Sequence, residues 1–200
     1  MTFTAEEIRK NYEGFSNEKL MRIATENAGT LSPEVVSILK DELRKRHLID
    51  EHIERSIAIQ AKELTEQELE AFINLIETLP CPICSTTSQR LNLSSVFSVT
   101  SFIIITQFKG KNVIACPDCL VKSLRRADTS TFLLGLWGIP WGVIRSVKAL
   151  VNNSISRKRV HQRSPLMKEF VKLKKGEIER WKNDSTNLLN LVKRNNEYVG

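Results

Sequence analysis

Apolar residues recur every three or four positions along the first 79 residues, in stretches separated by polar, turn-forming residues. This is the period of helices that bury one face and leave the other in water. A residue suited to capping a helix precedes each stretch, at Thr4, Ser16, Ser32, Asp50 and Thr65. The pattern predicts an N-terminal helical module over residues 1–79.

The pattern changes at residue 80. The stretch from Leu91 to Phe108 has no charged residue and is rich in β-branched and aromatic types, which favour strands. The residues Lys109-Gly110-Lys111-Asn112 are typical of a turn, and Val113 begins a second apolar run. We therefore expect a β-hairpin within residues 80–121, turning at 109–112.

All four cysteines lie at the base of this expected hairpin, in two Cys-Pro-x-Cys motifs. The motifs supply Cys81 and Cys84 on one side and Cys116 and Cys119 on the other. Each motif presents two sulfurs to one ion at about 2.3 Å, and two such pairs complete a tetrahedral site. The spacing predicts a zinc ribbon with one structural Zn²⁺, whose binding would add on the order of 10 kcal/mol to folding.

Two other interpretations of the cysteines are weaker. A redox dithiol needs one motif at a strand-to-helix junction in a βαβ unit, and neither motif is predicted there. Disulfides need an oxidising compartment, whereas Met1–Lys10 has no apolar core of a signal peptide, which predicts a cytoplasmic protein. The three histidines, His47, His52 and His161, are not needed as ligands, and four cysteine ligands leave no position for a catalytic water.

Residues 122–163 form a third segment, apolar in its middle and basic at both ends. Sixteen uncharged residues separate Asp128 from Arg145, fewer than the roughly 18–20 that cross a bilayer as one helix. Three interpretations remain open: an interfacial or re-entrant membrane element, a buried connector, or a protein–protein anchor. The candidate anchor residues are Phe132, Leu133, Leu134, Leu136, Trp137, Ile139 and Trp141.

Charge is distributed unevenly along the chain. Residues 1–80 carry a net charge of −6 and residues 81–200 a net charge of +13. The basic half favours phosphate, in nucleic acid or in anionic lipid headgroups. The cations that flank the apolar segment are Arg125, Arg126, Arg145, Lys148, Arg157, Lys158 and Arg159. Beyond them, residues 164–200 are predicted to form C-terminal helices.

Two parts of the chain resemble known groups of proteins. The order of the two cysteine motifs followed by Leu134-Gly-Leu-Trp-Gly-Ile-Pro-Trp-Gly142 is similar to uncharacterised bacterial zinc-ribbon proteins, over about Cys81 to Val151. The chain departs from that group where Leu136 replaces the first tryptophan. Separately, the stretch from Tyr12 to Arg46 is similar to a small helical module at the front of bacterial membrane-associated proteins. These resemblances imply a fold and proximity to a membrane, and no activity.

Together these observations predict an α+β protein with a helical module, a zinc ribbon, a Trp/Gly apolar segment and C-terminal helices. We find no metal-protease, nucleophile-elbow or phosphate-loop motif, so a non-enzymatic protein is expected. The first hypothesis is a peripheral protein that binds anionic lipid at the inner face of the membrane, or a protein partner. The alternative is a nucleic-acid-binding zinc-ribbon protein, and no small-molecule substrate is inferred.

Overall fold

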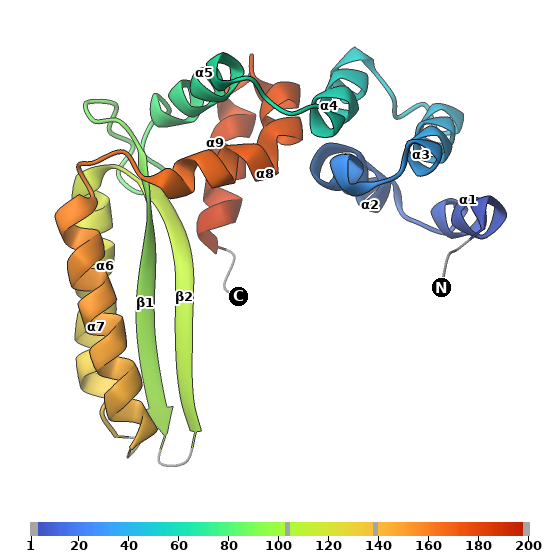
Figure 1. Ribbon diagram of the computed structural model, residues 1–200. Helices are drawn as coiled ribbons and strands as arrows, with labels where there is room; N and C mark the ends of the chain where they lie inside the picture. The colour runs from blue at the N-terminus through green and yellow to red at the C-terminus, as the bar shows by residue number, and fades with distance from the viewer. Residues whose placement is uncertain (1–3, 103–104, 138–139, 198–200) are drawn as a thin grey trace. The chain divides into compact units, whose positions relative to one another are not determined.

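The computed structural model is α+β, and it describes residues 4–102, 105–137 and 140–197 (Figure 1). The elements, in chain order, are α1 (Ala5–Glu13), α2 (Asn17–Arg22), a π-helix (Ile23–Asn27), a 3₁₀-helix (Ala28–Thr30), α3 (Pro33–Lys45), α4 (Glu51–Ala61), α5 (Glu66–Glu77), β1 (Asn92–Phe102), β2 (Ile105–Ala115), α6 (Pro117–Leu134), α7 (Trp141–Arg159), α8 (Pro165–Trp181) and α9 (Ser185–Glu197).

These elements form two compact units. One holds Met1–Phe72 with Phe170–Asp184, and the other holds Ile73–Glu169 with Ser185–Gly200. Helices α5 and α8 each contribute residues to both units. This division follows packing, whereas the boundaries 79/80, 121/122 and 163/164 follow composition and remain a prediction about sequence segments.

The helices expected in the first unit are confirmed, and so are the caps that begin them. The hydroxyl of Thr4 accepts from the backbone N–H of Glu7 at 3.3 Å, and the Glu7 carboxylate accepts from the Thr4 N–H at 2.8 Å. Thr65 and Glu68 repeat this capping box at α5. The predicted periodicity of apolar residues becomes a core of Tyr12, Leu20, Ala24, Ala28, Ile38, Leu39, Leu43, Ile53 and Ile57.

The middle of α8 packs closely against this core at a glycine. The Ser56 hydroxyl donates to the carbonyl oxygen of Gly176 at 2.6 Å, and the Gln60 amide donates to the Thr25 carbonyl beside it. A Cβ atom at position 176 would lie 2.3 Å from the Thr25 carbonyl oxygen. Only glycine permits this approach, so Gly176 is required for α8 to pack against the helices of the first unit.

The second unit is built on the predicted hairpin, but the hairpin does not turn where the sequence suggested. Strands β1 and β2 pair antiparallel from Asn92↔Ala115 to Phe102↔Ile105, and residues 103–104 lie outside the described residues. The predicted turn at 109–112 is wrong, because Gly110 pairs with Phe97 inside the ladder. Its Cα faces the Phe97 ring, where an added Cβ would be only 3.0 Å from the ring atoms. The glycine makes space for an aromatic neighbour within a strand.

Helices α6 and α7 lie along β1, and α9 lies beside β2 (Figure 1). The outer edge of each strand is bonded by an asparagine side chain. Asn153 of α7 accepts from the Phe97 N–H at 2.9 Å and donates to the Phe97 carbonyl at 2.7 Å. Asn196 of α9 does the same for Ile114, at 2.8 and 2.9 Å. A side-chain amide has the donor and acceptor of a peptide group, so each helix satisfies one exposed backbone position of the hairpin.

Candidate metal centre

The first cysteine pair lies in a tight loop after α5. The N–H of Ser85 donates to the carbonyl of Cys81 at 2.8 Å, and the N–H of Cys81 donates to the carbonyl of Thr86 at 2.9 Å. These bonds fold the loop so that Cys81 and Cys84 face the same way. The turn places Ser85 at φ 60°, in the left-handed region that favours glycine.

The second cysteine pair begins α6. Cys116 is the N-cap residue, Pro117 is the first helical residue, and Cys119 lies in the first turn. The second motif therefore lies at a strand-to-helix junction, because β2 ends at Ala115, but the expectation that neither motif lies at such a junction in a βαβ unit holds. The surrounding topology still differs from a βαβ unit, since β1 and β2 are antiparallel neighbours.

The hairpin base brings the four sulfurs together, as predicted. All four Sγ atoms lie within 4.8 Å of one another, and Cys84 and Cys116 are 3.7 Å apart. Tetrahedral ligands at about 2.3 Å from an ion are about 3.8 Å apart, so this spacing fits one metal ion at the centre. The four cysteines are free, with Cys84 exposed and the other three buried. The cluster can hold a metal ion through four thiolates.

The electrostatic environment is uneven across the cluster. Burial raises the pKa of the Cys81 thiol, but the backbone amides of Cys116, Cys84 and Ile83 outweigh it and lower the pKa to about 7. The Cys116 N–H donates to the Cys81 sulfur at 3.4 Å. Burial raises the pKa of Cys116 and of Cys119. Adjacent buried thiols resist ionisation without a cation, and a coordinated metal ion deprotonates them outright.

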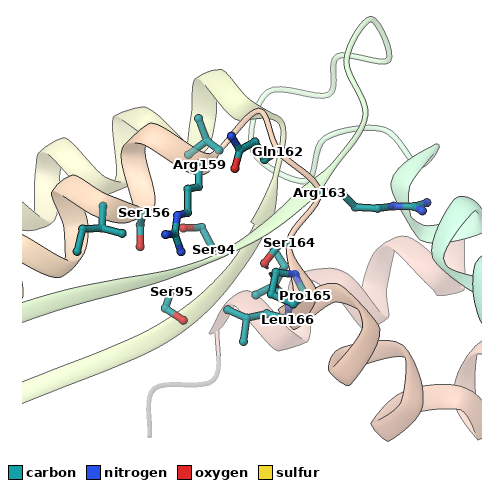
Figure 2. Close-up of a pocket in the computed structure, with 12 residues that line it drawn as sticks. Ser94, Ser95, Ser156, Arg159, Gln162, Arg163, Ser164, Pro165 and Leu166 are labelled. Carbon is teal, nitrogen blue, oxygen red and sulfur yellow. Dashed lines mark hydrogen bonds between the residues drawn. The ribbon is translucent and has the colours of Figure 1, made fainter.

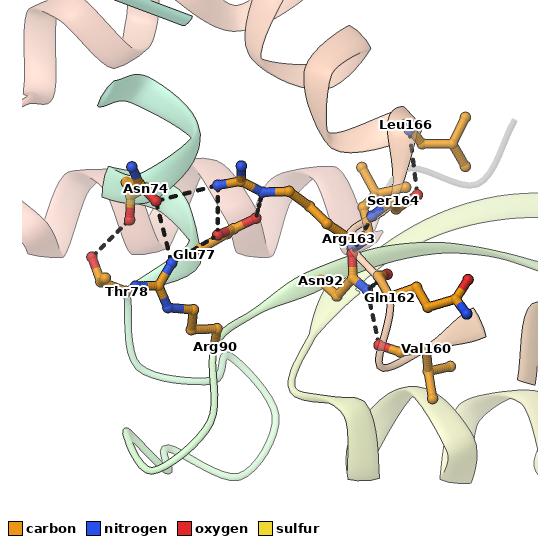
Figure 3. Close-up of polar contacts among 11 residues, drawn as sticks. Asn74, Glu77, Thr78, Arg90, Asn92, Val160, Gln162, Arg163, Ser164 and Leu166 are labelled. Carbon is orange, nitrogen blue, oxygen red and sulfur yellow. Dashed lines mark hydrogen bonds and ion pairs between the residues drawn. The ribbon is translucent and has the colours of Figure 1, made fainter. Parts of the chain in front are cut away.

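A polar cluster around Glu77 fastens the loop that carries the first pair (Figure 3). Glu77 is only 4% exposed. Its carboxylate accepts hydrogen bonds from Arg163 at 2.7 and 3.0 Å and from Arg90 at 3.4 Å. The Glu77 carbonyl also accepts from the Leu91 N–H at 2.8 Å. Glu77 therefore joins both ends of the loop between α5 and β1. The sequence analysis missed this role because neither arginine is near Glu77 in a recognisable motif.

The predicted anchor residues surround the junction of α6 and α7. Phe132 is 64% exposed, Trp137 73% and Trp141 63%, and Leu133, Leu134 and Leu136 are also exposed. Ile139 lies outside the described residues. The interpretation of a buried connector is therefore wrong for the described members of this set.

Glycines pack the backbone beneath these exposed side chains. An added Cβ at Gly142 would lie 2.7 Å from the Gly135 carbonyl oxygen and 2.8 Å from the Ser101 hydroxyl, and one at Gly135 would lie 2.3 Å from the Ser146 hydroxyl. The Ser101 hydroxyl also donates to the Gly135 carbonyl at 2.9 Å. The ends of α6, α7 and β1 are thus held together by close backbone packing.

The predicted basic residues do not form one patch. Arg157 is paired with Asp128, and Arg145 donates to the Thr106 carbonyl at 2.8 Å. Arg126 lines a groove of about 430 Å³ together with Lys109 and Lys111, which the sequence analysis had placed in a turn. Arg159 lines a different pocket, and the others, Arg125, Lys148 and Lys158, are exposed on α6 and α7.

Comparison with known proteins adds no assignment: no protein-family model, curated protein or solved structure matches this chain. Within the described residues, none of the helices has both the length and the apolar character needed to cross a membrane.

Proposed function

We propose that this is a non-enzymatic structural-zinc protein that binds the surface of anionic membranes through the junction of α6 and α7. One observation carries the proposal. Eleven large apolar side chains between Phe132 and Ile155 are exposed, whereas only four others in the described chain are. Monomeric proteins seldom expose such a concentration of apolar side chains without a binding role. We call this surface the apolar tip, defined by Phe132, Leu133, Leu134, Leu136, Trp137, Trp141, Val143, Ile144, Val147, Val151 and Ile155.

The donor set favours zinc as the metal. Four thiolates in tetrahedral spacing are typical of structural zinc, which has no preference for another geometry and is stable in a reducing compartment. Elemental analysis of protein purified without added metal should give one zinc per chain. Iron in its place would contradict the assignment of zinc and leave the four-cysteine site intact.

Lipid is the favoured partner because of three features: the helical spacing of the apolar residues, the exposed tryptophan rings and the scarcity of acidic residues. Ile144, Val147, Val151 and Ile155 recur at helical spacing along α7, as in helices that lie in the membrane interface. Tryptophan rings prefer that interface. Between Thr78 and Lys168 the only acidic residues are Asp118 and Asp128, so little negative charge opposes an anionic surface. Each cation near the surface adds about 1 kcal/mol.

Flotation with vesicles tests this proposal. Wild type should float with vesicles of phosphatidylglycerol and phosphatidylcholine, and much less with phosphatidylcholine alone. The double substitution Trp137→Ser with Trp141→Ser removes two exposed rings and should weaken binding at least about tenfold, by the area of apolar surface removed. Leu173→Ser is the matched control, because Leu173 is an exposed apolar residue of α8 in the first unit.

Wild type that stays unbound with anionic vesicles would contradict the proposal. If it also forms a dimer that the double substitution dissociates, the apolar tip is a protein interface instead. Light scattering on the same samples separates these results.

Nucleic-acid binding is a second candidate, favoured by the groove between the hairpin and α6. Lys109, Lys111 and Arg126 line it with three serines, and no acidic residue is part of its described lining. Phosphate contacts dominate nucleic-acid affinity and weaken with salt. Binding of generic DNA or RNA at about 50 mM salt, lost in Lys109→Gln with Lys111→Gln, would support this candidate.

Two further parts of the proposal concern activity and location. A metal with four cysteine ligands has no open position for substrate, which supports a structural role. Four free thiols are typical of a reducing compartment, so we propose a cytoplasmic location at the inner face of the membrane.

A further inference from the structure

A pocket of about 360 Å³ lies between β1, the end of α7 and the start of α8 (Figure 2). Its size is in the range of small-molecule sites. Serines line it from three sides: Ser94 and Ser95 from β1, Ser156 from α7 and Ser164 from the residue before α8. The Ser95 hydroxyl donates to the Asn112 side chain at 2.7 Å, so it is not available to a ligand. Apolar side chains, among them Ile155, complete the wall. The pocket therefore offers a polar region next to an apolar one.

The pocket contains one uncommitted cation. Arg159 lines the pocket together with Ser94 and Ser156, and its guanidinium pairs with no carboxylate in the part of the chain that the structure describes. The other arginine of the lining, Arg163, points away and binds Glu77. No aspartate or glutamate is among the described lining residues. The positive charge is thus available to an anion, and a guanidinium can bind two oxygens at once.

Ser94 supplies a hydroxyl that a ligand in the pocket can reach. The residue is only 7% exposed, and its hydroxyl has no hydrogen-bond partner within residues 4–102, 105–137 and 140–197. The Ser94 oxygen is open to the pocket, because it is not among the fully buried side-chain atoms that lack a partner in the described residues. Because Ser94 lines the pocket, an oxygen of a bound ligand can supply the partner that the protein does not.

The wall opposite β1 is fixed in place before any ligand binds. The Asn92 amide donates to the carbonyls of Val160 and Gln162 at 2.8 and 2.6 Å, and its carbonyl oxygen accepts from the Ser164 N–H at 3.1 Å (Figure 3). Arg163, in the same segment, is held by Glu77. A site whose walls are held by hydrogen bonds loses little conformational entropy on binding.

We infer that this pocket binds a small phosphate monoester. The tetrahedral phosphate group has enough acceptor oxygens for the Arg159 guanidinium and for the hydroxyls of Ser94 and Ser156 together. The organic part of the ester would lie against the apolar wall at Ile155. This inference does not depend on the membrane proposal. Ile155 belongs both to the apolar tip and to the wall of this pocket, so a lipid headgroup is a second source of the same phosphate chemistry, which the experiment below distinguishes from a soluble ester.

Titration of the full-length, ¹⁵N-labelled protein with phenyl phosphate tests the inference. At ionic strength matched with sodium chloride, the backbone amides of Ser94, Ser156 and Ser164 should shift and reach saturation. Inorganic phosphate should bind more weakly, because it lacks the apolar group. Arg159→Gln should raise the Kd for phenyl phosphate about tenfold or more, the cost of a charge-assisted hydrogen bond.

Lys158→Gln is the matched control, since it removes one exposed positive charge from the neighbouring position of α7 without changing the pocket lining. It should leave the Kd nearly unchanged. If both substitutions raise the Kd equally, the binding comes from the overall positive charge and not from the pocket, and the inference is overturned. Titration without saturable shifts would overturn it as well. If only anionic vesicles bind, and Arg159→Gln weakens that binding, a lipid headgroup occupies the pocket and the soluble ester is wrong.

Discussion

The two ends of the hairpin are stabilised by different kinds of groups. At the base, three of the four cysteines are buried and the surrounding backbone and Glu77 side chain are hydrogen-bonded inward. At the other end, the backbones of α6, α7 and β1 pack tightly through Gly135 and Gly142, and the large apolar side chains point outward. At the base, the cysteine and Glu77 side chains stabilise the fold. The apolar tip obtains its structure from the backbone, which leaves its side chains available for binding.

Removing one sulfur tests the base most severely. Cys116→Ser should abolish metal binding and lower the free energy of unfolding of the second unit by about 5 kcal/mol or more, because structural metal binding is folding free energy. Elemental analysis measures the metal, and urea unfolding followed by circular dichroism measures the stability. Asp118→Asn, which changes a residue of the same motif that is not a proposed ligand, should retain the metal. A Cys116→Ser protein with wild-type stability would mean that the base does not need its ion.

Between the two ends, replacing Asn153 tests how much its hydrogen bonds to the edge of β1 stabilise the middle of the hairpin. Asn153→Leu should cost about 2–3 kcal/mol, since it leaves the Phe97 backbone groups and the Asp128 carboxylate without this partner. Urea unfolding is again the measurement. Asn152→Leu, at the next position of α7, is the control and should change stability little. Equal losses in both variants would show that leucine itself, and not the lost amide, is responsible.

At the apolar tip, a single methyl group tests the backbone packing. Gly142→Ala should destabilise the second unit by about 2 kcal/mol, because the new Cβ would overlap the Gly135 carbonyl and the Ser101 hydroxyl. Gly14→Ala is the comparison, because its Cβ would come no closer than 3.5 Å to its neighbours. Thermal unfolding of both proteins measures the difference. Unchanged stability in Gly142→Ala would mean that the tip is loosely packed.

The smallest expected effect is a gain in the free energy of unfolding, from a substitution at the base of the hairpin. Ser85→Gly should stabilise the metal-loaded protein by about 0.5–1 kcal/mol, because glycine adopts positive φ without the clash of a Cβ atom. Ser85→Ala keeps the Cβ and should give no gain. Urea unfolding at a fixed zinc concentration compares the two. Equal stability of the glycine and alanine variants would argue against strain at this turn.

Local signals in the sequence predicted much of this structure. The caps at Thr4, Asp50 and Thr65 and the clustering of the four cysteines follow from spacing alone, because each depends on residues that are close in sequence or share a motif.

What the sequence did not reveal depends on distant pairs. Gly110 appeared to be a turn residue, since its pairing with Phe97 is visible only once the strand register is known. Asn153 and Asn196 carry no signal, because a single polar residue on a helix is most often solvated. The pocket at Arg159 combines residues from β1, α7 and the segment before α8 that no motif connects.

The asparagines on the hairpin edges also limit how this protein can associate with others. A sheet of two strands normally offers both margins as templates on which a foreign peptide can extend it. Here such a peptide would first have to displace Asn153 from Phe97, or Asn196 from Ile114. Recruitment by β-augmentation is therefore disfavoured at these positions, and so is the edge-to-edge stacking that begins many aggregates.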